Sequence, residues 1–165
     1  MRFVLLRERD LDGAAFALLA ERLARAVHAD VLLSLHSRPE VAARLGAGVH
    51  LAESGGPPPP APWHGRSVHG GEAAARAREQ GAAYLIAGTI FSSAGKPGAV
   101  PVGTAGLRAM CAAAGSTPVY AIGGVDLEDV PEVRRAGAHG IAVVGAIQEA
   151  ADPAAAARAL AEALD

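Results

Sequence analysis

Short aliphatic and β-branched runs alternate with alanine-rich stretches along the 165 residues of this chain. The stretches between the runs place apolar residues at helical spacing, as in Phe16, Leu19, Leu23 and Val27. Strands that alternate with helices predict right-handed crossovers and a parallel sheet. The apolar runs predict strands at 3–6, 31–35, 49–51, 84–87, 118–122 and 141–144, and one more that ends at Ser67 and Val68.

Capping residues predict where several helices begin and end. Asp10 or Asp12 is expected to cap a helix that continues to about Val27. A Pro in the first turn predicts a short helix over 39–46, and Asp126 is expected to cap a helix that ends at Gly137. Gly81 suits the position after a helix over 72–80. Further helices are expected around 107–114, at 146–149 and at 153–164.

Two segments rich in glycine and proline predict exposed loops. Residues 53–63 read ESGGPPPPAPW, and neither a helix nor a central strand is compatible with that composition. This loop is expected to replace the helix that a repeating β-α unit would place there. A second loop is expected at 91–103, between a strand and a helix.

Two architectures fit a parallel sheet of about seven strands, namely an open doubly wound sheet and a (β/α) barrel. A full barrel of eight units usually needs about 200 residues or more, so the chain is short of one by roughly one β-α unit. Length therefore argues against a closed barrel, and the motifs have to decide between the two.

Composition narrows the class of protein. The formal net charge is −2, hydrophobic residues make up 51%, and Cys111 is the single cysteine. Without a basic stretch, nucleic acid and membrane surfaces are not expected partners. A single cysteine gives no intramolecular disulfide and no zinc cluster, and the apolar runs are too short for a signal peptide or a membrane span. We expect one cytoplasmic domain over 1–165.

Glycines that directly follow two strands are candidates for phosphate binding. The segments AIGGV (121–125) and VVGAI (143–147) each place glycine between a hydrophobic strand and a helix. Glycine lets the backbone approach a ligand, and N–H groups at a helix start can hold a phosphate. The alternative is an ordinary turn glycine. The candidate residues are Gly123, Gly124, Val144, Gly145 and Ala146.

Basic side chains are expected at the same edge of the sheet. Arg7 and Arg9 follow the first strand, where two guanidiniums suit a phosphate or a carboxylate. The alternative is a set of salt bridges at the mouth of a barrel. Lys96, in the second loop, is either another phosphate ligand or a solvated side chain.

Histidines are the candidate acid–base groups, because imidazole titrates near neutral pH. His69 and His36 each end a strand at the ligand edge, and His69 is either catalytic or a satisfied structural histidine. The remaining histidines are expected to be packed and hydrogen-bonded (His50), structural (His28, His139) or peripheral (His64). Carboxylates suited to Mg²⁺ are scarce at these strand ends, so no metal site is expected.

Several segments together resemble the thiamine phosphate synthase/TenI superfamily. They are LLRERD, GVHL, GRSVH, AAYLIAGTIF, PVYAIGGVDLEDVPEVRRAGAHGIAVVGAI and a following AxDP, and they cover nearly the whole chain in order. The resemblance implies a (β/α) barrel that binds a phosphorylated thiazole in thiamine biosynthesis. We therefore expect a TIM-type barrel that lacks the first β-α unit.

The superfamily has two main branches, and the motifs look closer to TenI, the thiazole tautomerase. Arg7-Glu8-Arg9 and the segment from Arg66 to His69 match that branch. This likeness implies an isomerase without metal or cofactor, in which His69 is the general acid/base that moves a proton to aromatise a carboxylated thiazole phosphate.

The synthase branch joins a pyrimidine pyrophosphate to thiazole phosphate with Mg²⁺. The sequence departs from its pattern at Leu5, which stands at a Gln position, and at 36–38, where His-Ser-Arg stands for Asn-Asp-Arg. Thiamine phosphate synthase, a transferase, is the alternative enzyme. A non-catalytic thiazole-phosphate-binding protein is the alternative from a different class.

The family begins with a short β-α unit before the strand that carries Arg-Glu-Arg, whereas here Met1 stands almost at that strand. Three explanations are open. The true start lies upstream, a partner chain fills the gap in a homodimer or higher oligomer, or the chain is a degenerate member with lost or altered activity.

Overall fold

Seven strands form one parallel sheet in the computed structural model, which describes residues 3–92 and 98–164. Their order in the sheet is their order in the chain, and every neighbouring pair is parallel. The predicted parallel sheet of about seven strands is confirmed. The strands are β1 (Phe3–Leu6), β2 (Leu32–His36), β3 (Gly48–Leu51), β4 (His64–Val68), β5 (Tyr84–Gly88), β6 (Val119–Ile122) and β7 (Gly140–Ala142).

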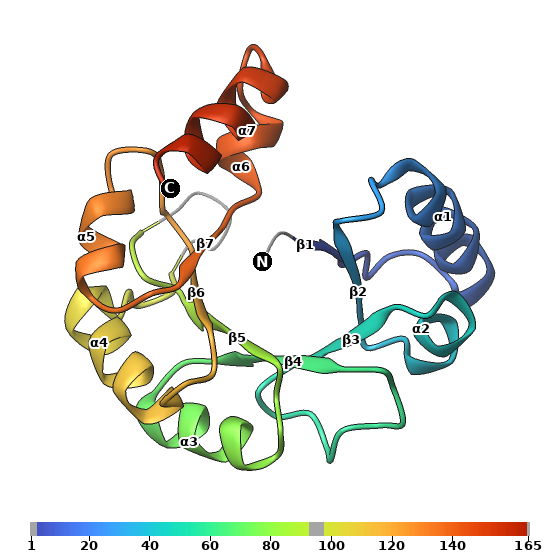
Figure 1. Ribbon diagram of the computed structural model, residues 1–165, viewed down its shortest axis with the longest axis horizontal. Helices are drawn as coiled ribbons and strands as arrows, with labels where there is room; N and C mark the ends of the chain where they lie inside the picture. Colours follow the sequence, from blue (N-terminus) through green and yellow to red (C-terminus); the bar gives the residue numbers. More distant parts are fainter. Residues whose placement is uncertain (1–2, 93–97, 165) are drawn as a thin grey trace.

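The sheet curls into a half-barrel with helices along its outer face (Figure 1). The proline-rich segment 52–63 joins β3 to β4 without a helix, as its composition predicts. No helix in the described ranges is long and apolar enough to cross a membrane. The helices are α1 (Gly13–Ala26), α2 (Pro39–Leu45), α3 (Gly71–Glu79), α4 (Gly103–Ala114), α5 (Val130–Arg135), α6 (Gly145–Gln148) and α7 (Pro153–Glu162).

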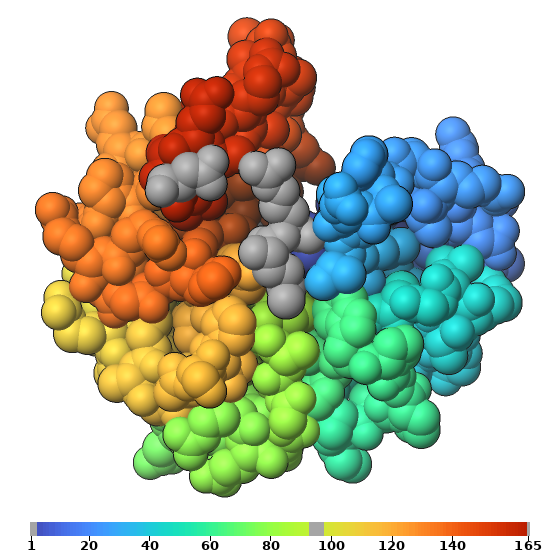
Figure 2. Space-filling model, in the orientation of Figure 1, coloured from blue at the N-terminus to red at the C-terminus, as the bar shows by residue number. Residues whose placement is uncertain are grey.

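The barrel is open between its first and last strands. β1 and β7 are the two edges of the sheet in the part of the chain that the structure describes. Figure 1 shows α1 and α7 on opposite sides of this opening, and Figure 2 shows the same parts as a blue and a red lobe separated by a notch. The fold is thus an α/β TIM-like half-barrel, as predicted.

The helix caps agree with the sequence prediction at α1 and differ from it at α5. The Asp12 carboxylate accepts a hydrogen bond from the Ala15 N–H at 2.8 Å, so Asp12 caps α1 as predicted. The prediction that Asp126 caps a helix is wrong, because α5 begins only at Val130. The Asp126 carboxylate instead accepts from the Glu128 N–H at 3.0 Å, in a local turn that competes with helix formation.

Aromatic rings fill the inside of the curl. The Phe3 ring, on β1, lies 4.6 Å from the Tyr84 ring on β5 and 5.1 Å from the Tyr120 ring on β6, measured between centroids. A Cβ at Gly65 would lie 2.1 Å from the Tyr84 ring, so this position admits only glycine without a shift of the ring. The outer face of the sheet packs against the helices in two apolar clusters, centred on Leu107 and on Phe16.

Candidate active site

The candidate residues meet at the edge where the parallel strands end. Because all strand pairs are parallel, the residues that follow the strands share one edge of the sheet. Arg7, His36 and His69 lie at or just beyond the carboxyl ends of β1, β2 and β4. The structure thus brings these three predicted site residues to a common edge.

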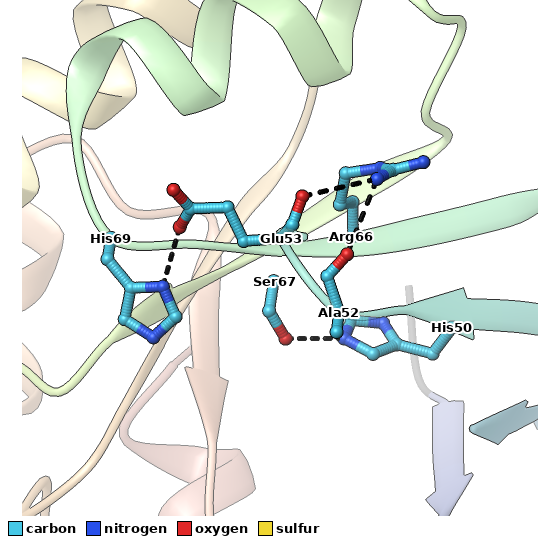
Figure 3. A network of polar contacts seen from close by, with 6 residues as sticks. All are labelled: His50, Ala52, Glu53, Arg66, Ser67 and His69. Carbon is cyan, nitrogen blue, oxygen red and sulfur yellow. Dashed lines mark hydrogen bonds and ion pairs between the residues drawn. The ribbon is translucent and has the colours of Figure 1, made fainter. Parts of the chain in front are cut away.

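His69 is paired with a carboxylate from the neighbouring loop. Its Nδ1 lies 2.6 Å from Oε2 of Glu53, which follows β3 (Figure 3). The two side chains are 54% and 35% exposed, so solvent reaches both. A carboxylate accepts at Nδ1 and orients the ring, which leaves Nε2 available to a ligand. The sequence analysis singled out His69 and did not identify Glu53 as its partner.

A chain of buried hydrogen bonds runs beneath this edge. The Tyr84 hydroxyl lies 3.1 Å from the Ser34 hydroxyl and 2.9 Å from Nδ1 of His50. Nε2 of His50 lies 2.9 Å from the Ser67 hydroxyl. Four neighbouring parts of the barrel wall, β2, β5, β3 and β4, are thereby joined by side chains. The expectation that His50 is packed and hydrogen-bonded is confirmed.

Burial controls the charge of this chain of groups. His50 is 1% exposed, and its burial, together with nearby His36, Arg7 and Arg66, lowers its pKa to about 3. Burial also raises the pKa of the Tyr84 phenol. At neutral pH both groups are therefore uncharged, and the chain is held together by hydrogen bonds between neutral groups.

Basic side chains gather around His36. Burial lowers the pKa of His36, and the positive charges of Arg7, Arg9 and Arg38 lower it further. Within the described residues none of these three guanidiniums forms an ion pair, although Arg38 donates to the Leu11 carbonyl at 3.4 Å and stacks over Phe16. The predicted alternative for Arg7 and Arg9, a set of salt bridges at the barrel mouth, is not what the structure contains. Arg7 and Arg9 are exposed at this edge, so their guanidiniums can bind an anion.

The glycines after β6 have a packing reason of their own. Gly123 and Gly124 have positive φ angles of 95° and 63°. A Cβ at Gly124 would lie 2.4 Å from the Ser92 carbonyl, and one at Gly123 would lie 2.7 Å from the Thr89 side chain. The close approach of the loop after β5 therefore requires these glycines, and their phosphate role stays a prediction.

The turn after β7 also stays a prediction as a phosphate site. Gly145 begins α6, which is only four residues long, and Val144 before it is exposed. Ala146 is the next residue of the same helix. Lys96, the remaining predicted phosphate ligand, lies outside the described residues.

His64 differs from its prediction. It is buried and opens β4 rather than lying at the periphery. The reason is that the parallel pairing of β4 with β3 begins here: Val49 aligns with His64, and the Val49 N–H donates to the Trp63 carbonyl at 3.1 Å. His28 lies on the surface beside Asp30, before the start of β2 and thus at the opposite end of that strand from His36.

Among the residues that the structure describes, the acidic and histidine side chains do not assemble a metal centre. Among the described residues, no three His, Cys, Asp or Glu side chains are grouped so that they could hold a metal ion. The resemblance to the synthase branch implies Mg²⁺, which prefers several oxygen ligands in octahedral geometry. Glu53, the carboxylate nearest His69, is engaged by that histidine. The described donor set therefore does not fit a magnesium site built from protein side chains.

A parallel half-barrel with imidazole and guanidinium groups at its carboxyl edge is typical of α/β-barrel enzymes that act on small anionic substrates. The profile of the family described as Thiamine monophosphate synthase matches residues 1–147. The chain belongs to this family, and the family assigns it to thiamine biosynthesis.

Individual relatives agree with this assignment. The chain is 43% identical over 168 residues to a protein of Thermus thermophilus named thiamine-phosphate synthase, with 98% of this chain and 82% of the relative aligned. It is also 43% identical over 164 residues to one of the same name from Deinococcus radiodurans, of which it covers 58%.

Solved structures show the same fold. A thiamine phosphate pyrophosphorylase from Pyrococcus furiosus matches with a TM-score of 0.85 at 29% identity, over 98% of this chain and 82% of that one. A 3-hexulose-6-phosphate synthase shares the fold at a TM-score of 0.70 and 24% identity, covering 99% of this chain and 87% of that one.

Proposed function

We propose that the chain is a thiamine-phosphate synthase, which joins a pyrimidine pyrophosphate to a thiazole phosphate. The observation that carries this proposal is the exposed pair Arg7 and Arg9, which follows β1 at the carboxyl edge of the sheet and forms no ion pair among the described residues. The names of relatives that align with 98% of the chain support the same reaction. They favour it over thiazole tautomerisation, which the sequence motifs place first.

The proposed reaction develops negative charge on a leaving group, which basic side chains can stabilise. The thiazole ring nitrogen forms a new bond to the pyrimidine methylene carbon, and the bond from that carbon to pyrophosphate oxygen breaks. Pyrophosphate leaves with the electron pair, so negative charge develops on its oxygens. Guanidiniums bind such oxygens through paired hydrogen bonds and stabilise the developing charge. Arg7 and Arg9 would hold the leaving group, and the predicted glycine turns would hold the thiazole phosphate.

Kinetics of an arginine variant test this assignment. In Arg9→Gln we expect the KM for the pyrimidine pyrophosphate to rise about tenfold, the scale for a lost charged hydrogen bond. The KM for thiazole phosphate should stay unchanged. Arg76→Gln, on the exposed face of α3, is the matched control and should alter neither constant. Equal increases of both constants in Arg9→Gln would contradict a pyrophosphate site at this cluster.

The second candidate function is thiazole tautomerisation, which the pair of His69 and Glu53 favours. With Nδ1 hydrogen-bonded to Glu53 at 2.6 Å, Nε2 can take a proton from one position of the substrate and return it at another. Aromatisation of the carboxylated thiazole phosphate in EDTA, followed by ultraviolet absorbance, tests this candidate. Acceleration that is lost in His69→Ala supports it, and a rate equal to the uncatalysed one removes it.

A further inference from the structure

Arg66 is a buried guanidinium that is held by carbonyl oxygens. The residue, in the middle of β4, is 4% exposed, and it forms no ion pair with any carboxylate in the described ranges. A buried charge is costly unless polar groups surround it. Here the compensation comes from the backbone of one turn, residues 52–56. Nη1 donates to the Gly55 carbonyl at 2.7 Å and Nη2 to the Gly56 carbonyl at 2.7 Å, with longer bonds to Ala52 and Glu53.

This turn carries the partner of His69. Glu53 lies in the turn, and Figure 3 shows its backbone carbonyl facing Arg66 while its carboxylate reaches His69. Arg66 and His69 are three residues apart, one within β4 and one just beyond it. The same strand therefore supplies the side chain that fixes the turn and the imidazole that the turn contacts.

We infer that Arg66 is a positioning residue: it holds the 52–56 turn so that the Glu53 carboxylate stays on Nδ1 of His69. Because the carboxylate can only accept, the neutral imidazole then carries its proton on Nδ1 and presents Nε2 as an acceptor. The tautomer is a property of the unliganded protein. Its consequence for catalysis rests on the proposed function, in either of its two forms.

Two glycines in the turn provide a matched pair of variants. A Cβ at Gly55 would lie 2.9 Å from the Ala52 carbonyl, so Gly55→Ala must shift the turn. A Cβ at Gly56 would meet nothing within 4 Å, so Gly56→Ala should leave the turn in place. Neither change removes a side chain that touches His69. Gly55→Ala therefore moves Glu53 without altering its chemistry, and Gly56→Ala is the control.

The test is ¹⁵N NMR of the histidine rings in the free protein at about pH 8, where free imidazole is neutral. In the wild type we expect the Nδ1–H form of His69. In Glu53→Ala, Gly55→Ala and Arg66→Gln the ratio of Nδ1–H to Nε2–H should fall about tenfold, as for loss of a charged hydrogen bond. Gly56→Ala should keep the wild-type ratio. His50 reports on the barrel interior, and its tautomer should be unchanged in all variants.

Two results would overturn the inference. One is a wild-type ratio in both Gly55→Ala and Arg66→Gln, which would mean that the turn needs no clamp. The other is the Nε2–H form in the wild type, which would mean that Glu53 does not set the tautomer. If Arg66→Gln does not fold, the two glycine variants decide the outcome. Because no substrate is present, failure of the proposed reaction leaves this result unaffected.

Discussion

His50 is expected to make the fold sensitive to acid. Burial lowers its pKa from the ordinary value of 6.5 to about 3, so the folded protein keeps it neutral well below the pH at which the unfolded chain takes up a proton. A group with a lowered pKa in the folded state contributes stability above its unfolded pKa, and this stability is lost as the pH falls. The loss is expected between about pH 6.5 and pH 3.

The magnitude follows from proton linkage. At pH 5 the unfolded histidine binds nearly one proton more than the folded one, and 1.5 pH units below 6.5 correspond to about 2 kcal/mol of lost stability. His36, His64 and His139 also have lowered pKa values and add to the effect in the wild type. The contribution of His50 alone is therefore read as a difference between two proteins.

Urea denaturation of the wild type and His50→Gln at pH 7 and pH 5 measures that difference. The free energy of unfolding of the wild type relative to His50→Gln should fall by about 2 kcal/mol between the two pH values. His28→Gln, at an exposed position on the surface, is the control and should show a much smaller change. A difference for His50→Gln that does not vary with pH would refute the reasoning.

Three further substitutions test the packing and the helix caps. In Gly65→Ala the new methyl group must displace the Tyr84 ring, which is fully buried. The free energy of unfolding should therefore fall by about 1–3 kcal/mol, as for overpacked cores. Thermal unfolding by circular dichroism measures this loss, and an unchanged Tm would contradict the packing described. Asp12→Ala removes the hydrogen bond to the Ala15 N–H and should cost about 1 kcal/mol. Asp126→Ala, which does not cap α5, should cost clearly less in the same urea experiment, and equal losses would count against the observed cap assignment.

The architecture could be predicted because it depends on periodicity. Each β-α unit shows the change from strand to helix spacing within its own residues, and parallel pairing follows from the alternation. The start of α5 was missed because Asp126 and Asp129 are both plausible N-caps. Choosing among them requires knowing that Asp126 closes a local turn with Glu128 instead.

The sequence predicted those site residues that directly follow a strand, and it did not predict their partners from the loops. His69, His36 and Arg7 could be placed at the ligand edge because each follows a recognisable strand. Glu53 could not be paired with His69, since the path of the proline-rich loop is set by Arg66, whose contacts are to backbone carbonyls that carry no sequence signal. The clue that the sequence offered is Arg66 itself, an arginine in the middle of the β4 strand.

The buried chain from Ser34 to Ser67 depends on strand register. Its members are polar residues on four strands. Register pairs such as Ser34 with Gly48 and His50 with Gly65 align these strands so that the members meet. A shift of one residue would send each side chain to the other face of the sheet. Sequence alone gives the polar residues and not this alignment, so His50 could be predicted as packed while its partners could not be named.

Formation of thiamine phosphate tests the central claim most directly. The purified chain would be incubated with the pyrimidine pyrophosphate and thiazole phosphate, with and without added Mg²⁺, and the product measured as fluorescent thiochrome after oxidation. The account predicts product that forms faster than in a protein-free control and more slowly in Arg9→Gln. Absence of product under both conditions, from protein that is folded by circular dichroism, would contradict it.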